Sequence, residues 1–238
     1  MINEDFTTRS KIRDIGRWNV TSFVAEVANN LPDNATVLDA GAGECVYKRF
    51  FDHCNYKAID LAVGESRWNY TNLDYIGPLH DMPIESGTFD AVLCTQVLEH
   101  LEWPRESVRE MYRVLKPDGK LYMTVPMAHP VHQAPYDFFR FTSFGIVSIC
   151  KHSGFQDVKV TPFGGFWVRW AYELPRALSI FPTNDSDNPK CSFTVMVLIP
   201  VRLVALVTIR IFQRIFLWLD RFDKKKDDPF GWACVATK

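Results

Sequence analysis

Residues 37–44, with the sequence VLDAGAGE, constrain the fold of this chain more than any other segment. A short apolar run leads into Asp39, and two closely spaced glycines follow, which is typical of a buried strand that breaks into a tight turn close to a ligand. A second strand-like run at 56–59 ends in Asp60. This acid follows the glycine turn by about 20 residues, the spacing at which an acid hydrogen-bonds a ribose. The pattern predicts an α/β half-domain that binds a nucleoside.

Two nucleoside cofactors compete for this site. A dinucleotide fingerprint requires a third glycine where this chain has Val46. It also requires a helix start that receives a pyrophosphate, but Glu44 occupies that start and would repel an anion. Asp39 and Asp60, on either side of the glycines, favour a cationic ligand without phosphates. We therefore expect S-adenosylmethionine, with its ammonium, sulfonium and ribose diol, rather than NAD.

Further motifs follow in order along the chain. Together with 37–43 (VLDAGAG), they are Asp60, 89–94 (FDAVLC) with 97–100 (VLEH), and 113–121 (RVLKPDGKL). On these motifs the chain resembles class I S-adenosylmethionine-dependent methyltransferases, in the broad group of the quinone-biosynthesis enzymes. The resemblance covers roughly residues 35–160. It implies an α/β, Rossmann-like, seven-stranded and mostly parallel sheet with helices on both faces and an antiparallel last strand.

Apolar runs and turn signals predict where the strands and helices lie. We expect helices over 9–30, 104–115 and 142–153, and strands over 36–39, 56–60, 71–76, 89–95, 120–125, 156–161 and 232–237. The long apolar stretch between the strands predicted over 156–161 and 232–237 does not fit the alternation of strands and helices. The sequence therefore predicts a methyltransferase core of residues 1–161 with 229–238, and a hydrophobic helical insertion or cap over 162–228.

Charge and cysteine content narrow the class of protein. The net charge is −1, so we expect no affinity for nucleic acid. The polar, acidic start at 1–5 is unlike a signal peptide, which predicts a cytoplasmic protein. Six scattered cysteines without a CxxC pair are typical of reduced thiols, and we expect no metal site.

The resemblance implies a cofactor site at the carboxyl ends of the strands. The implied cofactor-binding residues are Asp39, Gly41, Ala42, Gly43, Asp60, Leu61, His80, Asp81, Met82 and Gln96. Asp39 would orient the loop or hold the amino group, and Asp60 would take the ribose hydroxyls unless it caps a helix. Pro78 stands where relatives often carry an acid, so Asp81 would take the adenine amino group or be an ordinary turn residue. Gln96 would contact the methionine part.

The segment 125–142 carries the candidate catalytic residues. Methyl transfer is an in-line displacement that needs alignment, and a hydroxyl acceptor must also lose a proton, for which histidine has a suitable pKa. We predict His132 as the general base, His129 as the second candidate, and Asp137 as its orienter or as a ligand for the acceptor. Asp137 and Arg140 could instead form a salt bridge that braces the loop.

Three other acidic or basic residues have simpler interpretations. Asp90 enters a buried strand and is predicted to hold a neighbouring turn. Glu99 and His100 are interpreted as a helix-start pair bonded to the backbone rather than as catalytic groups.

The insertion contains a nearly continuous apolar run over 193–219. Pro200 and Arg202 interrupt it, so we do not expect it to span a membrane. On a helix, its polar residues fall within roughly one third of the circumference, a basic stripe that suits an anionic lipid surface. These residues are Arg202, Arg210, Gln213, Arg214 and Arg221. The insertion could be a lid over an apolar acceptor pocket, a peripheral membrane contact through 193–221, or a homodimer interface.

These observations predict a methyltransferase that uses S-adenosylmethionine and a histidine base to methylate an oxygen of its acceptor. The acceptor would be a small molecule, a glycan or a lipid-linked compound, and the protein would be cytoplasmic or peripheral at the inner membrane surface. The alternative from another class is a catalytically inactive methyltransferase fold that serves as a binding or scaffold protein. An NAD-dependent oxidoreductase is disfavoured by Val46 and Glu44.

Overall fold

The computed structural model describes residues 8–64, 68–180 and 189–238, with side chains for 11–64, 68–179 and 200–238. The chain forms two compact units. We call residues 19–163 with 231–238 the sheet unit, and residues 164–230 with the described residues up to Trp18 the helical unit. The first helix thus belongs with the insertion, whereas the sequence assigned it to the core.

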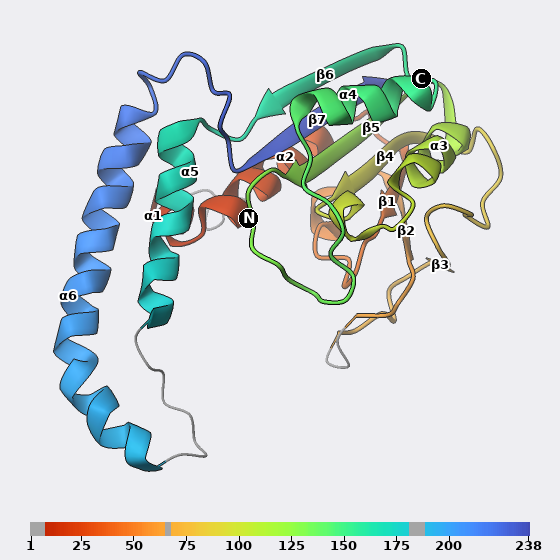
Figure 1. Ribbon diagram of the computed structural model, residues 1–238. Helices are drawn as coiled ribbons and strands as arrows, with labels where there is room; N and C mark the ends of the chain where they lie inside the picture. Colours follow the sequence, from red (N-terminus) through yellow and green to blue (C-terminus); the bar gives the residue numbers. More distant parts are fainter. Residues whose placement is uncertain (1–7, 65–67, 181–188) are drawn as a thin grey trace. The chain divides into compact units, whose positions relative to one another are not determined.

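The sheet unit is built on one seven-stranded sheet (Figure 1). Its strands are β1 (Thr36–Ala40), β2 (Asn55–Asp60), β3 (Tyr75–Ile76), β4 (Phe89–Thr95), β5 (Leu115–Pro126), β6 (Asp157–Pro162) and β7 (Gly231–Thr237). The first five strands pair in parallel, and β7 lies antiparallel between β5 and β6. The order β3-β2-β1-β4-β5-β7-β6 confirms the expected Rossmann-like sheet with its antiparallel last strand.

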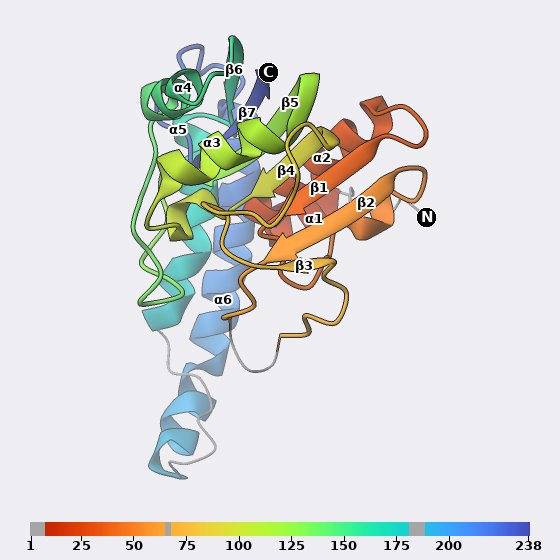
Figure 2. The ribbon, with the colours of Figure 1, turned by 90° about the vertical axis from the view of Figure 1, so that its right-hand side faces the viewer.

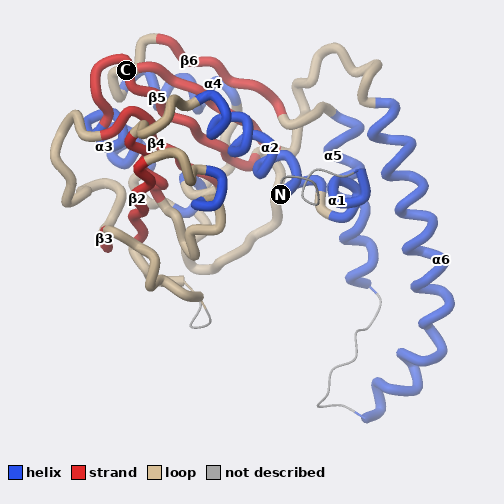
Figure 3. Tube along the Cα trace, turned by 180° about the vertical axis from the view of Figure 1, so that it is seen from behind, coloured by secondary structure: helices blue, strands red, loops and turns tan. Residues whose placement is uncertain are grey.

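Helices cover both faces of this sheet (Figures 2 and 3). On β5, Leu121 and Met123 belong to the core formed with α3 (Pro104–Val114) and α4 (Ser143–His152). Tyr122 alternates to the opposite face, where its ring lies 6.5 Å from that of Phe23 on α2 (Ile15–Asn30). The chain order reverses between β1 and β4, and in such sheets the ligand crevice lies at that point.

Two predicted elements differ in extent. The helix predicted over 9–30 is broken into α1 (Thr8–Arg13) and α2, because the Asp14 carboxylate accepts a hydrogen bond from Arg17 N at 2.9 Å and begins a new helix. The strand predicted over 71–76 is only Tyr75–Ile76. Asp74 explains the shortening, since its carboxylate accepts from Ala58 N at 3.0 Å and occupies the place of a backbone partner.

Asp90 has the predicted structural role. Its carboxylate accepts from Thr36 N at 2.8 Å and pairs with Lys116 Nζ at 2.8 Å, which holds the starts of β1 and β4 to the turn before Lys120. These contacts lower the pKa of Asp90 despite its partial burial. Residues 116–119 bulge out of the ladder at this point, so β5 starts earlier than the predicted residue 120.

The helical unit contains α1, α5 (Phe166–Glu173), the 3-10 helix η3 (Leu174–Ile180) and α6 (Pro189–Leu219). Within it, α5 and α6 run side by side (Figure 1). The buried carboxylate of Asp220 accepts from Gly165 N at 3.0 Å and Val168 N at 3.2 Å, and so caps the start of α5. Among the described residues, no helix has the length and apolar character needed to cross a membrane.

Candidate active site

A cavity of about 550 Å³ lies in the sheet unit at the carboxyl ends of β1, β2 and β4. This volume is within the range of small-molecule sites. Every residue that lines it lies between positions 39 and 138. Its walls are formed by the glycine loop, the loop after β2 and the segments 78–80, 95–103 and 133–138. The cavity therefore occupies the position that the parallel sheet predicts for a ligand.

The glycine loop is shaped by close packing against the end of β4. Gly41 has a φ of +83°, and a Cβ atom there would lie 2.5 Å from a methyl group of Val97. A side chain at this position is therefore excluded by both backbone conformation and contact. Gly43, with a φ of +52°, continues the turn, and both glycines and Ala42 line the cavity.

The backbone N–H groups of this loop are already used within the protein. Gly41 N and Ala42 N donate to Ile59 O at 2.8 and 3.1 Å, and Gly43 N donates to the Asp60 carboxylate at 2.9 Å. A phosphate-binding loop needs such groups free to cradle the anion. The loop therefore lacks the donors for a pyrophosphate, which agrees with the preference for a phosphate-free cofactor.

Asp39 lies at the inner end of the cavity and is 1% exposed. Tyr56 donates its hydroxyl to the Asp39 carboxylate at 2.5 Å. Burial raises the pKa of Asp39 to about 7, although the Tyr56 hydrogen bond opposes this shift. The sequence did not single out Tyr56, because its position in a strand gives no sign that its hydroxyl reaches the neighbouring strand.

Asp60 is held at the cavity by two backbone contacts. One carboxylate oxygen accepts from Gly43 N, and the other accepts from Ala62 N at 2.9 Å. Each oxygen keeps a further lone pair for a ligand hydroxyl. Leu61, next in sequence, also lines the cavity. The two residues occupy the place where the resemblance puts the ribose.

The predicted adenine segment contributes only in part. His80 lines the cavity, and its ring packs edge-on against Trp103 at 4.7 Å between centroids. Asp81 is exposed and outside the lining, and Met82 is buried in the core instead. Gln96 lines the cavity from the end of β4, where its side-chain amide donates to Thr124 Oγ1 at 3.2 Å.

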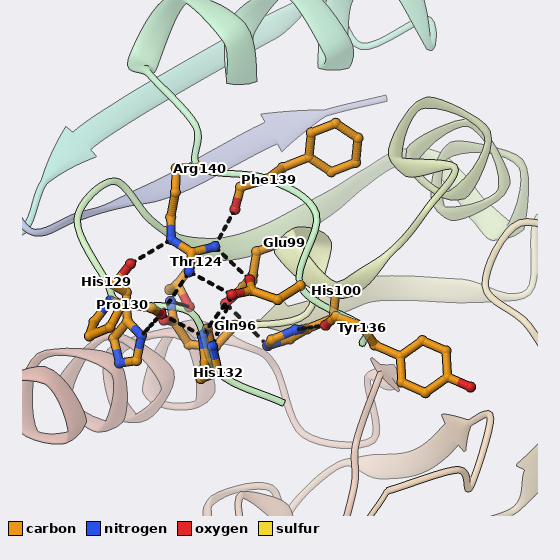
Figure 4. A network of polar contacts seen from close by, with 11 residues as sticks. Gln96, Glu99, His100, Thr124, His129, Pro130, His132, Tyr136, Phe139 and Arg140 are labelled. Carbon is orange, nitrogen blue, oxygen red and sulfur yellow. Dashed lines mark hydrogen bonds and ion pairs between the residues drawn. The ribbon is translucent and has the colours of Figure 1, made fainter. Parts of the chain in front are cut away.

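The three predicted catalytic residues lie outside the cavity lining. Asp137 accepts two hydrogen bonds from the Arg140 guanidinium, at 2.6 and 2.9 Å, which holds the pKa of Asp137 well below its ordinary value. Arg140 also donates to the carbonyls of His129 and Pro130 at 2.9 and 2.8 Å (Figure 4). The salt bridge therefore braces the loop, which was the alternative role considered for this pair.

Besides His80, the cavity is lined by His100, which follows β4 in the 3-10 helix η2 (Leu98–His100). Its Nδ1 lies 2.5 Å from the carbonyl oxygen of Tyr136, and His132 packs edge-on against its ring at 4.6 Å between centroids (Figure 4). The contact with Tyr136 fixes the proton on Nδ1 and leaves Nε2 with its lone pair. Burial lowers the pKa of both His100 and His132, which keeps both rings neutral near pH 7.

Glu99 lies beside this histidine pair and is fully buried. Within the described part of the chain, its carboxyl oxygens have no hydrogen-bond partner, and burial raises the pKa of Glu99 to about 8. Ligand-capable atoms of Glu99, His100 and His132 lie within 4.8 Å of one another, so these residues could hold a cation. From the sequence, Glu99 and His100 were given a structural role. Their proximity to His132 could not be predicted, because His132 is distant from them in the sequence and approaches them only in the folded protein.

Comparison with known proteins agrees with this geometry. Residues 38–123 match a family model described as a methyltransferase domain. Residues 38–123 therefore form a methyltransferase domain of the class I, S-adenosylmethionine-dependent type. S-adenosylmethionine is therefore the cofactor of this domain, and the acidic, phosphate-excluding cavity fits it.

Two curated relatives and one solved structure illustrate the similarity. The ubiquinone biosynthesis O-methyltransferase of Xanthomonas oryzae pv. oryzae (strain PXO99A) is 35% identical over 101 residues, covering 38% of this chain and 42% of the relative. The malonyl-[acyl-carrier protein] O-methyltransferase of Enterobacter lignolyticus is 30% identical over 96 residues, covering 38% of each chain. The chain thus matches less than half the length of these relatives.

The fold is shared over nearly the whole chain. A SAM-dependent methyltransferase from Archaeoglobus fulgidus superposes with a TM-score of 0.59 at 14% sequence identity, covering 96% of this chain and 97% of that one. Because the identity is so low, this similarity establishes the fold alone.

Proposed function

We propose that this chain methylates an oxygen atom of a small-molecule acceptor, free or lipid-linked, with S-adenosylmethionine as the methyl donor and a histidine as the base. Two lines of support converge. Both curated relatives described above are named as O-methyltransferases. The cavity is also lined by the glycine loop and Asp60, the proposed nucleoside contacts, together with His100.

The cofactor end of the cavity supplies contacts that suit a cationic nucleoside. Gly41 and Gly43 allow the loop to approach closely, and Asp60 offers lone pairs to the ribose hydroxyls. Asp39, steadied by Tyr56, lies where it can attract the ammonium group. Gln96 borders the methionine part. When bound, S-adenosylmethionine supplies an electrophilic methyl group on its sulfonium.

His100 is the observation that carries the proposed chemistry. Its ring lines the cavity, its Nδ1 is committed to the Tyr136 carbonyl, and its lowered pKa keeps Nε2 unprotonated at neutral pH. A hydroxyl acceptor can therefore give its proton to Nε2 as the oxygen attacks the methyl group. We assign His132, predicted from the sequence as the base, a positioning role through its edge contact with His100.

The proposed acceptor end of the cavity, beside His100, is aromatic. Tyr136 and Phe138 line it and are 49% and 42% exposed. Such side chains can pack against an apolar acceptor while the enzyme mainly aligns its oxygen with the methyl group. This wall favours an acceptor with an apolar or aromatic body.

The test compares His100→Gln with His132→Gln. S-adenosylhomocysteine affinity is measured by calorimetry, and turnover is measured as S-adenosylhomocysteine release with a panel of phenolic and carboxylate acceptors. We expect His100→Gln to lower kcat by about 100-fold or more, as for the loss of a general base, with cofactor affinity nearly unchanged. His132→Gln should have a smaller effect.

Two outcomes would contradict the proposal. An effect of His132→Gln as large as that of His100→Gln, with an unaltered pH profile for His100→Gln, would return the base to His132. A wild-type protein that binds no S-adenosylhomocysteine would favour the non-catalytic scaffold.

A further inference from the structure

The exposed side of α6 carries a signal that the proposed reaction does not use. Within the part of α6 whose side chains are described, and just beyond its end, large apolar side chains are between 42 and 67% exposed. They are Val201, Leu203, Val204, Val207, Ile211, Phe212, Ile215, Trp218 and Phe222. We call this set the α6 apolar face. A contiguous apolar surface of this kind marks an interaction site.

The polar side chains of α6 turn inward in part, which corrects the predicted basic stripe. Gln213 is only 1% exposed and donates to Ala171 O on α5 at 2.8 Å. Arg210 donates to Gln213 Oε1 at 2.8 Å and to the carbonyl oxygen of Ile12. These partners draw the polar residues into the helical unit and leave the apolar side facing outward. A helix on a protein surface normally does the opposite, with its polar side toward water and its apolar side toward the core.

The spacing within the α6 apolar face shows what shape of partner it fits. Val204, Val207 and Ile211 repeat after 11 residues as Ile215, Trp218 and Phe222. An 11-residue repeat corresponds to about 3.67 residues per turn, close to the 3.6 of a straight helix, whereas a left-handed coiled coil needs 3.5. The apolar stripe therefore runs nearly straight along α6, so it can lie on a flat surface over its length, and it does not match a left-handed coiled-coil partner.

The charges beside this stripe indicate the chemistry of that surface. Arg214 and Arg221 are exposed, as are Lys224 and Lys225 just after the helix. The sequence has no Asp or Glu between 200 and 219. Of the acids that follow, Asp220 is buried and Asp223 accepts hydrogen bonds from backbone N–H groups, whereas Asp227 is exposed. A second copy of the same face would oppose arginine to arginine, whereas anionic headgroups would complement them. Trp218 lies at the basic end, a common place for an aromatic residue at a membrane interface.

We propose that the α6 apolar face docks this protein on the surface of a bilayer that contains anionic lipid, with α6 in the plane of the interface. Amphipathic helices bind in this way by burying apolar side chains among the acyl chains while basic residues meet the headgroups. The link to catalysis, that a lipid-linked acceptor is met at this surface, rests on the proposed function; the docking itself does not. Residues 193–199 of the predicted contact lie outside the described side chains.

The test is co-sedimentation of the full chain with vesicles of phosphatidylcholine, with or without about one third phosphatidylglycerol. We expect binding to the anionic vesicles, and the double variant Ile211→Gln/Trp218→Gln should weaken it at least about tenfold because two apolar anchors are lost. Both residues are half exposed, so the fold should persist. Phe144→Gln is the matched control, since Phe144 is 84% exposed on α4.

A second variant examines the charges. Arg214→Gln/Arg221→Gln should weaken binding to the anionic vesicles and leave the residual binding to neutral vesicles unchanged. The proposal is overturned if the wild type does not sediment with anionic vesicles, or if the Ile211/Trp218 variant binds as well as the wild type. It is also overturned if light scattering shows a dimer that this variant abolishes, since a second copy would then cover the face. S-adenosylhomocysteine titration of the same proteins reports separately on the proposed function.

Discussion

At the residue scale, the charge of the cavity wall decides which nucleoside the loop can accept. Asp39, Glu44 and Asp60 all line the cavity, and Glu44 also accepts from Asn69 N at 3.1 Å. The glycine loop has no free backbone donors to offset these acids. A ligand with positive charge and no phosphate is therefore favoured, and in the proposed function Asp39 and Asp60 contact different parts of it.

The first residue-scale prediction concerns Asp60. Replacing it with Asn removes the charge from the acceptor proposed for the ribose hydroxyls but keeps one oxygen for the loop. We expect S-adenosylhomocysteine binding to weaken by roughly 10- to 100-fold, the cost of a lost hydrogen bond to a charged group. Calorimetric titration measures it, and unchanged affinity would remove Asp60 from the cofactor site.

Asp39→Asn provides the matched control for this assignment. If Asp39 acts on the amino group, this variant should weaken S-adenosylhomocysteine but not 5′-methylthioadenosine, which lacks the amino-acid part. Asp60→Asn should weaken both ligands to a similar extent, because both contain the ribose. The reverse pattern would exchange the two roles.

The second residue-scale prediction concerns Glu99 and pH. In the unfolded chain the pKa of a glutamate is about 4.3, whereas burial in the folded protein raises the pKa of Glu99 to about 8. Between these values the folded protein holds the extra proton, so the free energy of unfolding falls as pH rises, by up to about 1.4 kcal/mol per pH unit. The Glu99→Gln variant lacks this titrating group, so its free energy of unfolding should depend less on pH. Its stability relative to the wild type should be greatest above pH 8.

Urea unfolding of both proteins between pH 5 and 9 measures this difference. Asp39 also has a raised pKa, but it is present in both proteins and cancels in the comparison. Parallel profiles would mean that Glu99 is already ionised in the folded protein.

At the scale of elements, local signals predicted the sheet well and the long-range contacts poorly. The strands ending at Asp39 and Asp60 follow from apolar runs that stop at acids and glycines, and α3 follows from Pro104 and its apolar spacing. The break at Asp14 was missed because capping by a single side chain does not interrupt an apolar period.

The candidate site shows the same division. The glycine loop and Asp60 were selected from local sequence, and they line the cavity. The proposed base could not be located in this way, because His100 and His132 come together only when the Arg140 network folds the segment 129–140 back toward η2. The basic stripe predicted for α6 was wrong in part for a related reason. Which side of α6 is covered depends on the hydrogen bond from Gln213 to the Ala171 carbonyl on α5, and this contact cannot be read from local sequence.

At the scale of the whole molecule, the chain leaves the sheet and returns to it at one point. Phe163 N donates to Gly231 O at 2.9 Å, and Pro162 pairs with Trp232 in the antiparallel ladder of β6 and β7. Residues 164–230 of the helical unit are therefore inserted between two residues that already face each other across adjacent strands. This geometry allows the sheet unit to be closed without it.

The whole-molecule prediction uses this closure. A protein of residues 19–163 joined to 231–238 through Asn-Gly has the length and residues of a two-residue hairpin turn, which matches the twist of the strands. Because β7 stays between β5 and β6 and the cavity lining stays complete, we expect cooperative unfolding and S-adenosylhomocysteine affinity within a few-fold of the full chain. Calorimetry and urea unfolding measure both.

The shortened protein also separates the remaining roles of the insertion. If residues 164–230 serve for membrane docking, vesicle binding should be lost while methyl transfer to a water-soluble acceptor persists. If they serve as a lid, turnover of the same acceptor should fall although the cofactor still binds, since the acceptor would no longer be shielded from water. A shortened protein without a cooperative transition would show instead that the sheet unit depends on the helical unit for its stability, because β6 and β7 alone would not hold the turn between them.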